Sequence, residues 1–416
     1  MSPPQASFPI RRNTLLLAAA LAMSGGMMQV AVAVGTTTLV LVTGVKSIVG
    51  LGPAIFLSTA ALAALPAGRA MDHFGRMPVI AGGFATGIVA TVTVALGCLW
   101  VSTPLVVIGL ALVGASAGTV ILSRAAAADM YPPERRARGI SLVLFGAVFG
   151  AALGPLVFRP LFVGEHHVDT DSLVVPWLVA GAIMAAGLVI ALSVRPDPKR
   201  IGEALGYGAD GETGNAEAAP LREILRRPGV VPALVAAVAS FAVMVSVMNL
   251  SGYIVVGHGH SQADTFWVIS AHIVGMYGLV LVVGDVIDRV GRRPALIGGL
   301  LVMGVSTIFM AWIASVATMS LALFGLGLGW AFSYVAATSE LVDRAALSER
   351  GRLVGFSDLL SGFTGATLAL LGGVAYNSIG VEAVAVGATV AVALPALLLT
   401  LAGRRPPAAE ALEPAG

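Results

Sequence analysis

The sequence is poor in charged residues and almost free of cysteine, and each scarcity excludes a class of protein. Only 11% of the 416 residues are charged, 57% are hydrophobic, and the mean hydropathy is +0.93. Soluble globular proteins carry about 25% charged residues. This chain therefore cannot cover a large apolar core in water, and lipid must be the solvent for much of its surface. The single cysteine, Cys98, excludes a disulfide within one chain.

Sequence signals for enzymatic chemistry are also missing. The chain contains no Gly-x-x-x-x-Gly-Lys-Ser/Thr loop, which argues against direct coupling to ATP hydrolysis. Its paired histidines, His166-His167 and His258-Gly-His260, fall in predicted loops and do not form a metal-spaced cluster. The net charge of +2 is too small to indicate a nucleic-acid partner. We therefore expect no metal, no cofactor and no enzymatic activity.

Long apolar runs dominate what is present. A membrane-spanning helix needs about 20 mostly apolar residues, and twelve runs meet that length. The predicted spans of the first half are 14–36, 47–67, 78–99, 104–126, 139–161 and 173–194, and those of the second half are 230–255, 264–284, 295–315, 317–338, 353–375 and 380–402. The expected fold class is an all-α membrane protein with twelve transmembrane helices.

A short charged loop between two apolar runs occurs once in each half of the chain. The two copies read Gly68-Arg-Ala-Met-Asp72-His-Phe-Gly75-Arg76 and Gly284-Asp-Val-Ile-Asp288-Arg-Val-Gly291-Arg292. Internal repeats of this kind are common in secondary transporters. The spans are therefore expected to form two pseudo-symmetric six-helix bundles.

The basic residues predict the orientation of the spans. Of the 24 Lys and Arg residues, all but Lys46 and Arg159 fall in loops and tails on one side of the predicted membrane. The positive-inside rule assigns that side to the cytoplasm. Both termini are thus expected to be cytoplasmic, in a bacterial inner (cytoplasmic) membrane.

The chain divides at the polar segment between the two halves. We predict an N-terminal bundle over 1–194, a cytoplasmic linker over 195–229, a C-terminal bundle over 230–403 and a cytoplasmic tail over 404–416. Within the linker, residues 221–227 are basic and amphipathic and are expected to lie on the inner membrane surface.

The chain resembles the major facilitator superfamily over nearly its whole length, and in particular its drug/proton antiporter branch. The resemblance rests on the span count, the paired loops and the turn after the fourth span, Asp129-Met-Tyr-Pro-Pro-Glu-Arg-Arg-Ala-Arg-Gly139. It implies a conformational lock in which Asp72 docks on the start of the eleventh span and Arg76 pairs with Asp129. Such a lock ties the two halves together in the outward-facing state. The alternative is that the charges of the loop only determine the topology.

Further residues belong to the lock on the same grounds. Asp288, Arg292 and Asp343 are the counterparts expected in the second half. Gly68 and Gly75 are expected to allow tight turns and close backbone approach at helix ends.

The fifth predicted span carries Gly146, Gly150, Gly154 and Pro155 at spacings that suit close helix packing. The proline removes one backbone hydrogen bond and permits a bend. Two interpretations stay open, since the pattern also resembles an element associated with exporters, although the usual following glycine pair is missing.

Polar residues inside spans are costly and therefore indicate candidate functional positions. We expect Gln29 and Asn249 to face each other across the pseudo-two-fold axis, with Met28 and Met248 as a soft wall. An interhelical hydrogen bond without a ligand is the alternative for the two amides. His272 and Trp330 complete the predicted substrate cavity.

Two of the intramembrane residues are candidates for carrying a proton. Asp358 is the most deeply placed acid, and an inner gate or a contact with the loop that holds Asp72 are its alternative roles. His272 titrates near neutral pH when it is unperturbed. A structural role for His272 is equally open. The Arg that the family places early in the fourth span is missing near Leu110, and Arg124 is not an obvious substitute.

These observations predict a secondary active transporter, a proton-coupled exporter of small apolar or amphipathic compounds that works by alternating access. The first span holds no acid, which favours such substrates over organic cations. The alternative is an importer, either a proton symporter or a uniporter, and more remote ones are a lipid-modifying membrane enzyme and a sensor. The expected partners are a small-molecule substrate, protons and the lipid bilayer, and the protein is expected to be a monomer.

Overall fold

The structure is a computed structural model that describes residues 8–132, 135–164, 168–207, 219–312, 315–345 and 347–402. Every regular element in these residues is helical. The first half comprises α1 (Ile10–Thr43), η1 (Lys46–Ile48), α2 (Leu51–Phe74), α3 (Arg76–Leu99), α4 (Thr103–Val120), α5 (Ser123–Asp129), α6 (Arg136–Leu153), η3 (Gly154–Phe158), η4 (Arg159–Phe162) and α7 (Val174–Leu192). The later elements are α8 (Pro198–Ala204), α9 (Leu221–Arg226), α10 (Val230–Gly257), α11 (Gln262–Tyr277), α12 (Val280–Val290), α13 (Arg292–Phe309), α14 (Val316–Asp343), α15 (Leu347–Ser378) and α16 (Val381–Ala402).

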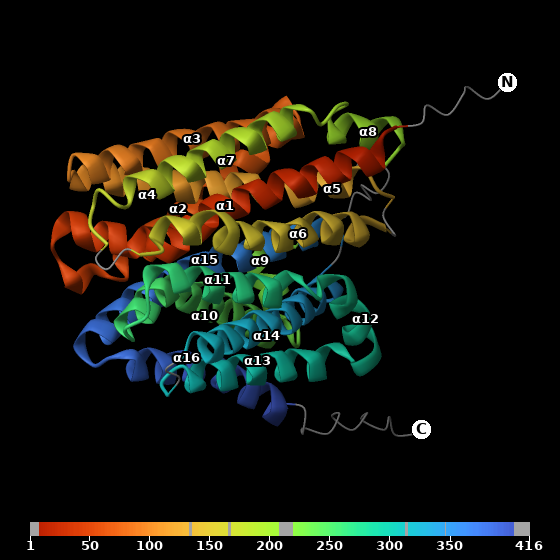
Figure 1. Ribbon diagram of the computed structural model, residues 1–416. Coiled ribbons are helices and arrows are strands. Elements are labelled where there is room, and N and C mark those ends of the chain that lie inside the picture. The colour runs from red at the N-terminus through yellow and green to blue at the C-terminus, as the bar shows by residue number, and fades with distance from the viewer. Residues whose placement is uncertain are drawn as a thin grey trace, which may run out of the picture.

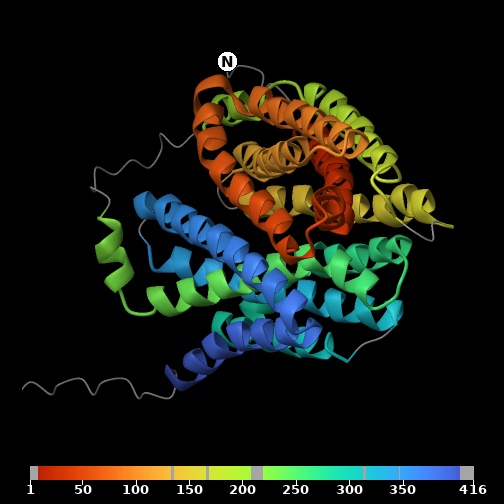
Figure 2. The same cartoon turned by 90° about the vertical axis from the view of Figure 1, so that its left-hand side faces the viewer.

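These helices form two bundles that lie side by side. Figures 1 and 2 show the helices of the first half, coloured red to yellow-green, on one side and the green-to-blue helices of the second half on the other. The two bundles meet mainly where α2 packs on α15, α1 on α10, and α6 on α11. We call this interface the seam. The fold class predicted from the sequence is confirmed.

The described chain has eleven helical segments long and apolar enough to cross a membrane, and twelve if one bent pair counts as a single span. That pair is α11 with the first part of α12, bent by 43°. The bend falls within the predicted eighth span, so hydropathy located the span but not its break.

The two copies of the charged loop have the same backbone geometry. Gly75 separates α2 from α3 at φ +94°, and Gly291 separates α12 from α13 at φ +90°. Residues with a side chain rarely adopt this conformation, so glycine is required at both turns. Gly68 differs, because it lies inside α2 with open space where a Cβ atom would project. The close approach expected at Gly68 is therefore absent from this structure.

The two ends of the bundles differ in charge. Consecutive spans run in opposite directions, so the turns at Gly75, Met130, Gly291 and Arg344 lie at the end where α1 begins. We call this the arginine-rich end and the opposite end the arginine-poor end.

The described parts of the linker are held to opposite bundles. α8 packs on α5 and α3 of the first half, whereas α9 packs on α10 and α15 of the second. Arg227, which follows α9, donates to both carboxylate oxygens of Glu349 at 2.6 and 2.8 Å. These hydrogen bonds hold the pKa of the Arg227 guanidinium above its ordinary value. Ile224 of α9 is fully buried, so this segment packs against protein through one face.

Candidate functional site

A carbonyl group freed by a proline joins three spans at the seam. Pro155 has no N–H to donate to the carbonyl of Ala151, four residues earlier. That oxygen accepts from Gln29 Nε2 of α1 at 3.0 Å and from Ser270 Oγ of α11 at 2.6 Å. Gln29 Nε2 also lies 3.0 Å from Ser270 Oγ. The contact connects the two halves, since α1 and α6 belong to the first and α11 to the second.

The glycines of the fifth span make this contact possible. A Cβ atom on Gly154 would lie 2.9 Å from both the Gln29 side chain and Ser270 Oγ. On Gly146 and Gly150 it would lie 2.3 Å from Ala18 O and 2.7 Å from Ala22 O. These two glycines therefore let α6 lie directly against α1, while Gly154 leaves room for the hydrogen bonds at the seam.

Further contacts close the seam toward the arginine-poor end. Gln262 Nε2, at the start of α11, donates to Ala33 O of α1 at 2.9 Å. Phe266 of α11 lies 5.8 Å from Phe158 and 5.7 Å from Phe162, measured between ring centroids. We call these contacts, together with those of Gln29 and Ser270 to Ala151 O, the outer seal. It holds no charged pair among its described contacts.

The second contact region of the outer seal is α2 against α15. A Cβ atom on Gly373 would lie 2.2 Å from Gly50 N, and one on Gly50 would lie 2.3 Å from Ala369 O. Backbone meets backbone here, because both glycines lack a side chain.

The two amides predicted to face each other have different partners. Asn249 Nδ2 donates to Val245 O of its own helix at 2.8 Å, and no hydrogen bond between Gln29 and Asn249 occurs among the described residues. Asn249 instead lines a small gap with Thr36 and Phe56 of the first half. Of the two methionines, Met248 is buried and Met28 is partly buried.

His272 lies inside the second bundle. Its ring is fully buried, and Nδ1 lies 2.7 Å from Leu323 O of α14. Because a carbonyl only accepts, Nδ1 carries the hydrogen, and Nε2 has no partner among the described residues. This geometry ties α11 to α14 within one half.

A group of aromatic rings surrounds Asp358 nearer the arginine-rich end. The Tyr334 hydroxyl donates to Asp358 Oδ1 at 2.5 Å. Trp330 stacks on Tyr334 with ring centroids 5.2 Å apart and planes inclined by 16°. Tyr277 and Phe241 border the same two rings at 6.0 and 5.7 Å. These five side chains come from α10, α11, α14 and α15, and we call them the aromatic cluster.

The first half contributes a cation to this region. Arg124 of α5 lies within electrostatic reach of Tyr277 and Tyr334. It is partly buried, and its guanidinium makes no hydrogen bond or ion pair within the described part of the chain. Sequence reasoning passed over this residue because it lies near the end of its span, and nothing in its neighbours along the chain points to the tyrosines of the other half.

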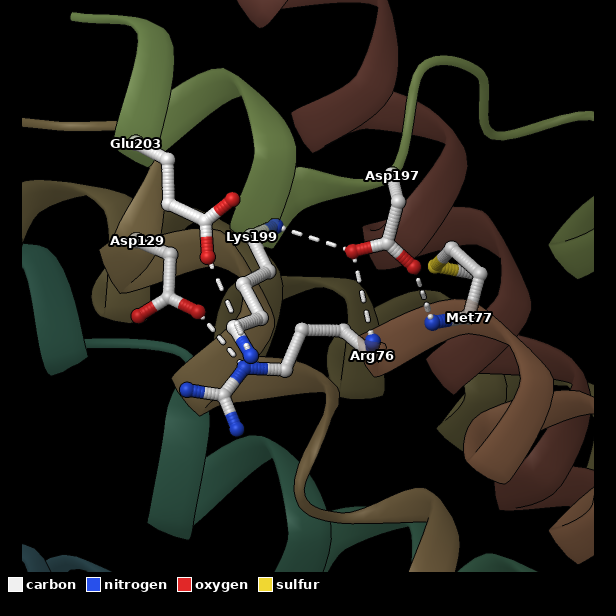
Figure 3. Close-up of polar contacts among 6 residues, drawn as sticks. All are labelled: Arg76, Met77, Asp129, Asp197, Lys199 and Glu203. Carbon is white, nitrogen blue, oxygen red and sulfur yellow. Dashed lines mark hydrogen bonds and ion pairs between the residues drawn. The ribbon is translucent and has the colours of Figure 1, made fainter. Parts of the chain in front are cut away.

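At the arginine-rich end, the structure brings together one expected pair and adds an acid. Arg76 Nε lies 2.6 Å from Asp129 Oδ2. The Asp197 carboxylate accepts from the backbone N–H groups of Arg76 at 3.2 Å and Met77 at 2.8 Å, and from Lys199 N at 2.9 Å. Figure 3 shows these contacts together. Asp197 therefore caps the N-termini of α3 and α8 at once.

Asp197 was missed in the sequence, although a signal was present. Asp followed by Pro198 is a common start of a helix, with the acid at the N-cap and the proline at the first helical position. That pattern predicts the cap of α8 but not the cap of α3, which lies far away in the sequence.

Three other predicted lock residues have side chains outside the described part of the structure, namely Asp72, Asp288 and Asp343. The tail at 404–416 also lies outside the described residues. In the second half, Arg292 Nη1 lies 3.5 Å from Ser339 O, and Glu340 pairs with Arg344.

Comparisons with known proteins agree with this architecture. The family model described as Major Facilitator Superfamily matches residues 14–284 and 233–416. The chain is 28% identical to the uncharacterized MFS-type transporter YdeG of Bacillus subtilis, over 90% of this chain and 88% of that protein. It is 29% identical to the riboflavin transporter RfnT of Brucella anthropi, over 90% and 91%. A partially occluded inward-open structure of the E. coli xylose transporter XylE superposes with a TM-score of 0.71 at 14% identity, covering 94% of this chain and 97% of that one.

Proposed function

The chain belongs to the major facilitator superfamily and is a membrane transporter, and we propose that it is a proton-coupled exporter of small amphipathic compounds. In this proposal the arginine-rich end faces the cytoplasm of a bacterial cell and the protein acts as a monomer. The observation that carries the proposal is the hydrogen bond between Tyr334 and Asp358, a carboxylate held inside a span beside the seam.

A carboxylate in this position suits proton coupling. Burying a charge inside a span is costly, so Asp358 must be neutralised by a proton or held by donors while it is ionised. Tyr334 supplies one donor, and partial exposure leaves the rest of the carboxylate open to water or substrate. Exchange of the proton for a substrate at this position, followed by rocking of the two halves, gives antiport.

The outer seal supports the alternating-access part of the proposal. It holds the seam together at the arginine-poor end with neutral hydrogen bonds and glycine contacts, which can separate without exposing a buried charge. In the outward-facing state these contacts would part, and the Arg76–Asp129 pair would act in the lock at the other end.

Accumulation of fluorescent and antibiotic compounds in an efflux-deficient bacterial host tests the direction of transport. The panel includes riboflavin, since one relative is named as its transporter. Export predicts lower accumulation in cells that express the protein, and the difference should vanish when the proton gradient is collapsed. Higher accumulation with the same dependence would establish import instead.

Proteoliposomes loaded with substrate test the coupling residue. Asp358→Asn should retain exchange of labelled for unlabelled substrate but lose transport driven by an imposed pH gradient. Glu382→Gln is the matched control, because Glu382 is an exposed acid at the start of α16, at the arginine-poor end. If Asp358→Asn keeps gradient-driven transport at the level of Glu382→Gln, Asp358 is not the coupling residue.

A further inference from the structure

The aromatic cluster contains more polar groups than packing of the second bundle requires. Trp330 is 9% exposed, and its Nε1–H has no partner among the described residues. A buried indole N–H normally finds an acceptor. Because Nε1 is itself buried in this conformation, an acceptor reaches it only when the neighbouring side chains move.

The other four side chains of the cluster are not fully buried. Phe241, Tyr277, Tyr334 and Asp358 are each partly exposed. Arg124 of the opposite half lies within electrostatic reach of the same tyrosines. Because groups of both halves lie near this region, we take the exposed parts of these side chains to face the path between the halves.

The chemistry of these groups defines what they can bind. The partly exposed ring of Tyr334, stacked on Trp330, offers apolar aromatic surface, which favours a planar aromatic ligand. Trp330 Nε1 and the Arg124 guanidinium are donors only, whereas an ionised Asp358 only accepts. A ligand that satisfies all three must carry an acceptor and a donor on one flat ring system.

From this combination we infer that the aromatic cluster with Arg124 is a substrate site for neutral, planar heteroaromatic compounds with a lactam-type edge. The carbonyl of that edge accepts from Trp330 Nε1 and Arg124, and its N–H donates to Asp358. The inference rests on the proposed function, and it adds the substrate class. We expect neutral ligands to be favoured over organic cations, because Arg124 places a like charge beside the site.

The same arrangement gives a physical reason for exchange of substrate against proton. A proton on Asp358 occupies the position to which the ligand N–H would donate. Binding of the ligand and protonation of Asp358 therefore oppose each other, which is the relation that antiport requires.

Equilibrium binding to the purified protein in lipid nanodiscs tests the inference without a proton gradient. The probe is lumichrome, a neutral tricyclic compound with two N–H groups on its pyrimidinedione edge, and the matched probe is its 1,3-dimethyl derivative, which lacks both of them. Lumichrome should bind at least about tenfold more tightly than the dimethyl derivative, since a site built to hydrogen-bond a donor discriminates strongly against its absence. Tetraphenylphosphonium, an organic cation, should not compete.

Two tryptophan variants supply the protein-side control. Trp330→Phe keeps one aromatic ring but removes the N–H and part of the stacking surface, and it should weaken lumichrome binding by about tenfold. Trp312→Phe should bind as the unaltered protein does, because Trp312 is 73% exposed and lies outside the cluster. Equal affinity of the two variants, or of lumichrome and its dimethyl derivative, would overturn the inference.

The binding result is separable from the transport result. Proton-driven transport of other compounds without lumichrome binding would refute the substrate class and leave proton-coupled export in place. Lumichrome binding without proton-driven transport would support the substrate class and refute proton-coupled export.

Discussion

The outer seal and the aromatic cluster lie at the same seam but are built from different chemistry. The outer seal joins the halves through amide, hydroxyl and backbone groups, with glycines at the closest contacts. The aromatic cluster contains an acid and four aromatic rings, with an arginine from the other half beside it. The outer seal therefore stabilises one conformation, whereas the aromatic cluster has polar groups that packing does not use and that can bind a ligand or a proton.

The largest effect is expected from overpacking the outer seal. Gly373→Ala places a Cβ atom against the backbone of Gly50, which cannot move aside like a flexible side chain. Overpacking costs about 1–3 kcal/mol, so the population of the sealed arrangement should fall by about fivefold or more. A cysteine introduced at the buried position Thr36, in a Cys98→Ser background, should become reactive toward a water-soluble thiol reagent.

Gly387→Ala is the control for this experiment, because a Cβ atom there meets nothing within 4 Å. If the cysteine at position 36 reacts equally in both variants, the glycine contact does not maintain the seal.

A second large effect, on transport, is expected at the aromatic cluster. Arg124→Gln removes the cation that the first half brings to the aromatic cluster, and hydrogen bonds to charged groups contribute about 1.5–3 kcal/mol. Transport of heteroaromatic substrates should fall by about 10–100-fold, with an unchanged thermal unfolding midpoint because Arg124 makes no described polar contact. Arg222→Gln, at an exposed arginine of α9, is the control. A lowered unfolding midpoint with normal transport would assign Arg124 a structural role.

An intermediate effect is expected where Ala151 O meets two donors. Gln29→Leu or Ser270→Ala leaves one donor in place, so each should lower the free energy of unfolding by about 1 kcal/mol or less. The double variant leaves the carbonyl without either donor and should cost about 1–3 kcal/mol, more than the sum of the single changes. Thermal unfolding of the four proteins in one detergent measures the difference.

Pro155→Ala is the decisive addition to that series. It restores an N–H to the fifth span four residues after Ala151, and it should recover part of the stability lost in the double variant. Strictly additive single effects, or no recovery, would show that the freed carbonyl is not the common partner.

The smallest effect is expected away from the seam. Asp197→Ala removes a cap shared by α3 and α8, and loss of an N-cap costs about 1 kcal/mol. Stability should fall slightly while the affinity for substrate stays the same. Asp171→Ala, at an exposed loop acid, controls for loss of charge alone. A substrate affinity altered by Asp197→Ala would connect this cap to the binding site.

Much of the architecture could be predicted because the relevant signals are local. Apolar runs locate the spans, the repeated loop reveals two halves, and Gly75 and Gly291 occupy turns that need glycine. The partners of Gln29 were not predictable in the same way. We expected it to face Asn249, and the structure pairs it with Ala151 O and Ser270 instead.

The sequence by itself determined the solvent of this protein, its spans, its internal repeat and the side chains that cannot rest in lipid without a partner. Only the tertiary structure decided which partner each of them has, as with Arg124 beside the tyrosines of the other half or Asp197 on α3. The physical reason is that these spans are apolar on nearly every face, so no amphipathic pattern fixes how each helix is rotated about its own axis. Rotation and crossing are set by glycine contacts and a few polar groups, and these act only when distant parts of the chain meet.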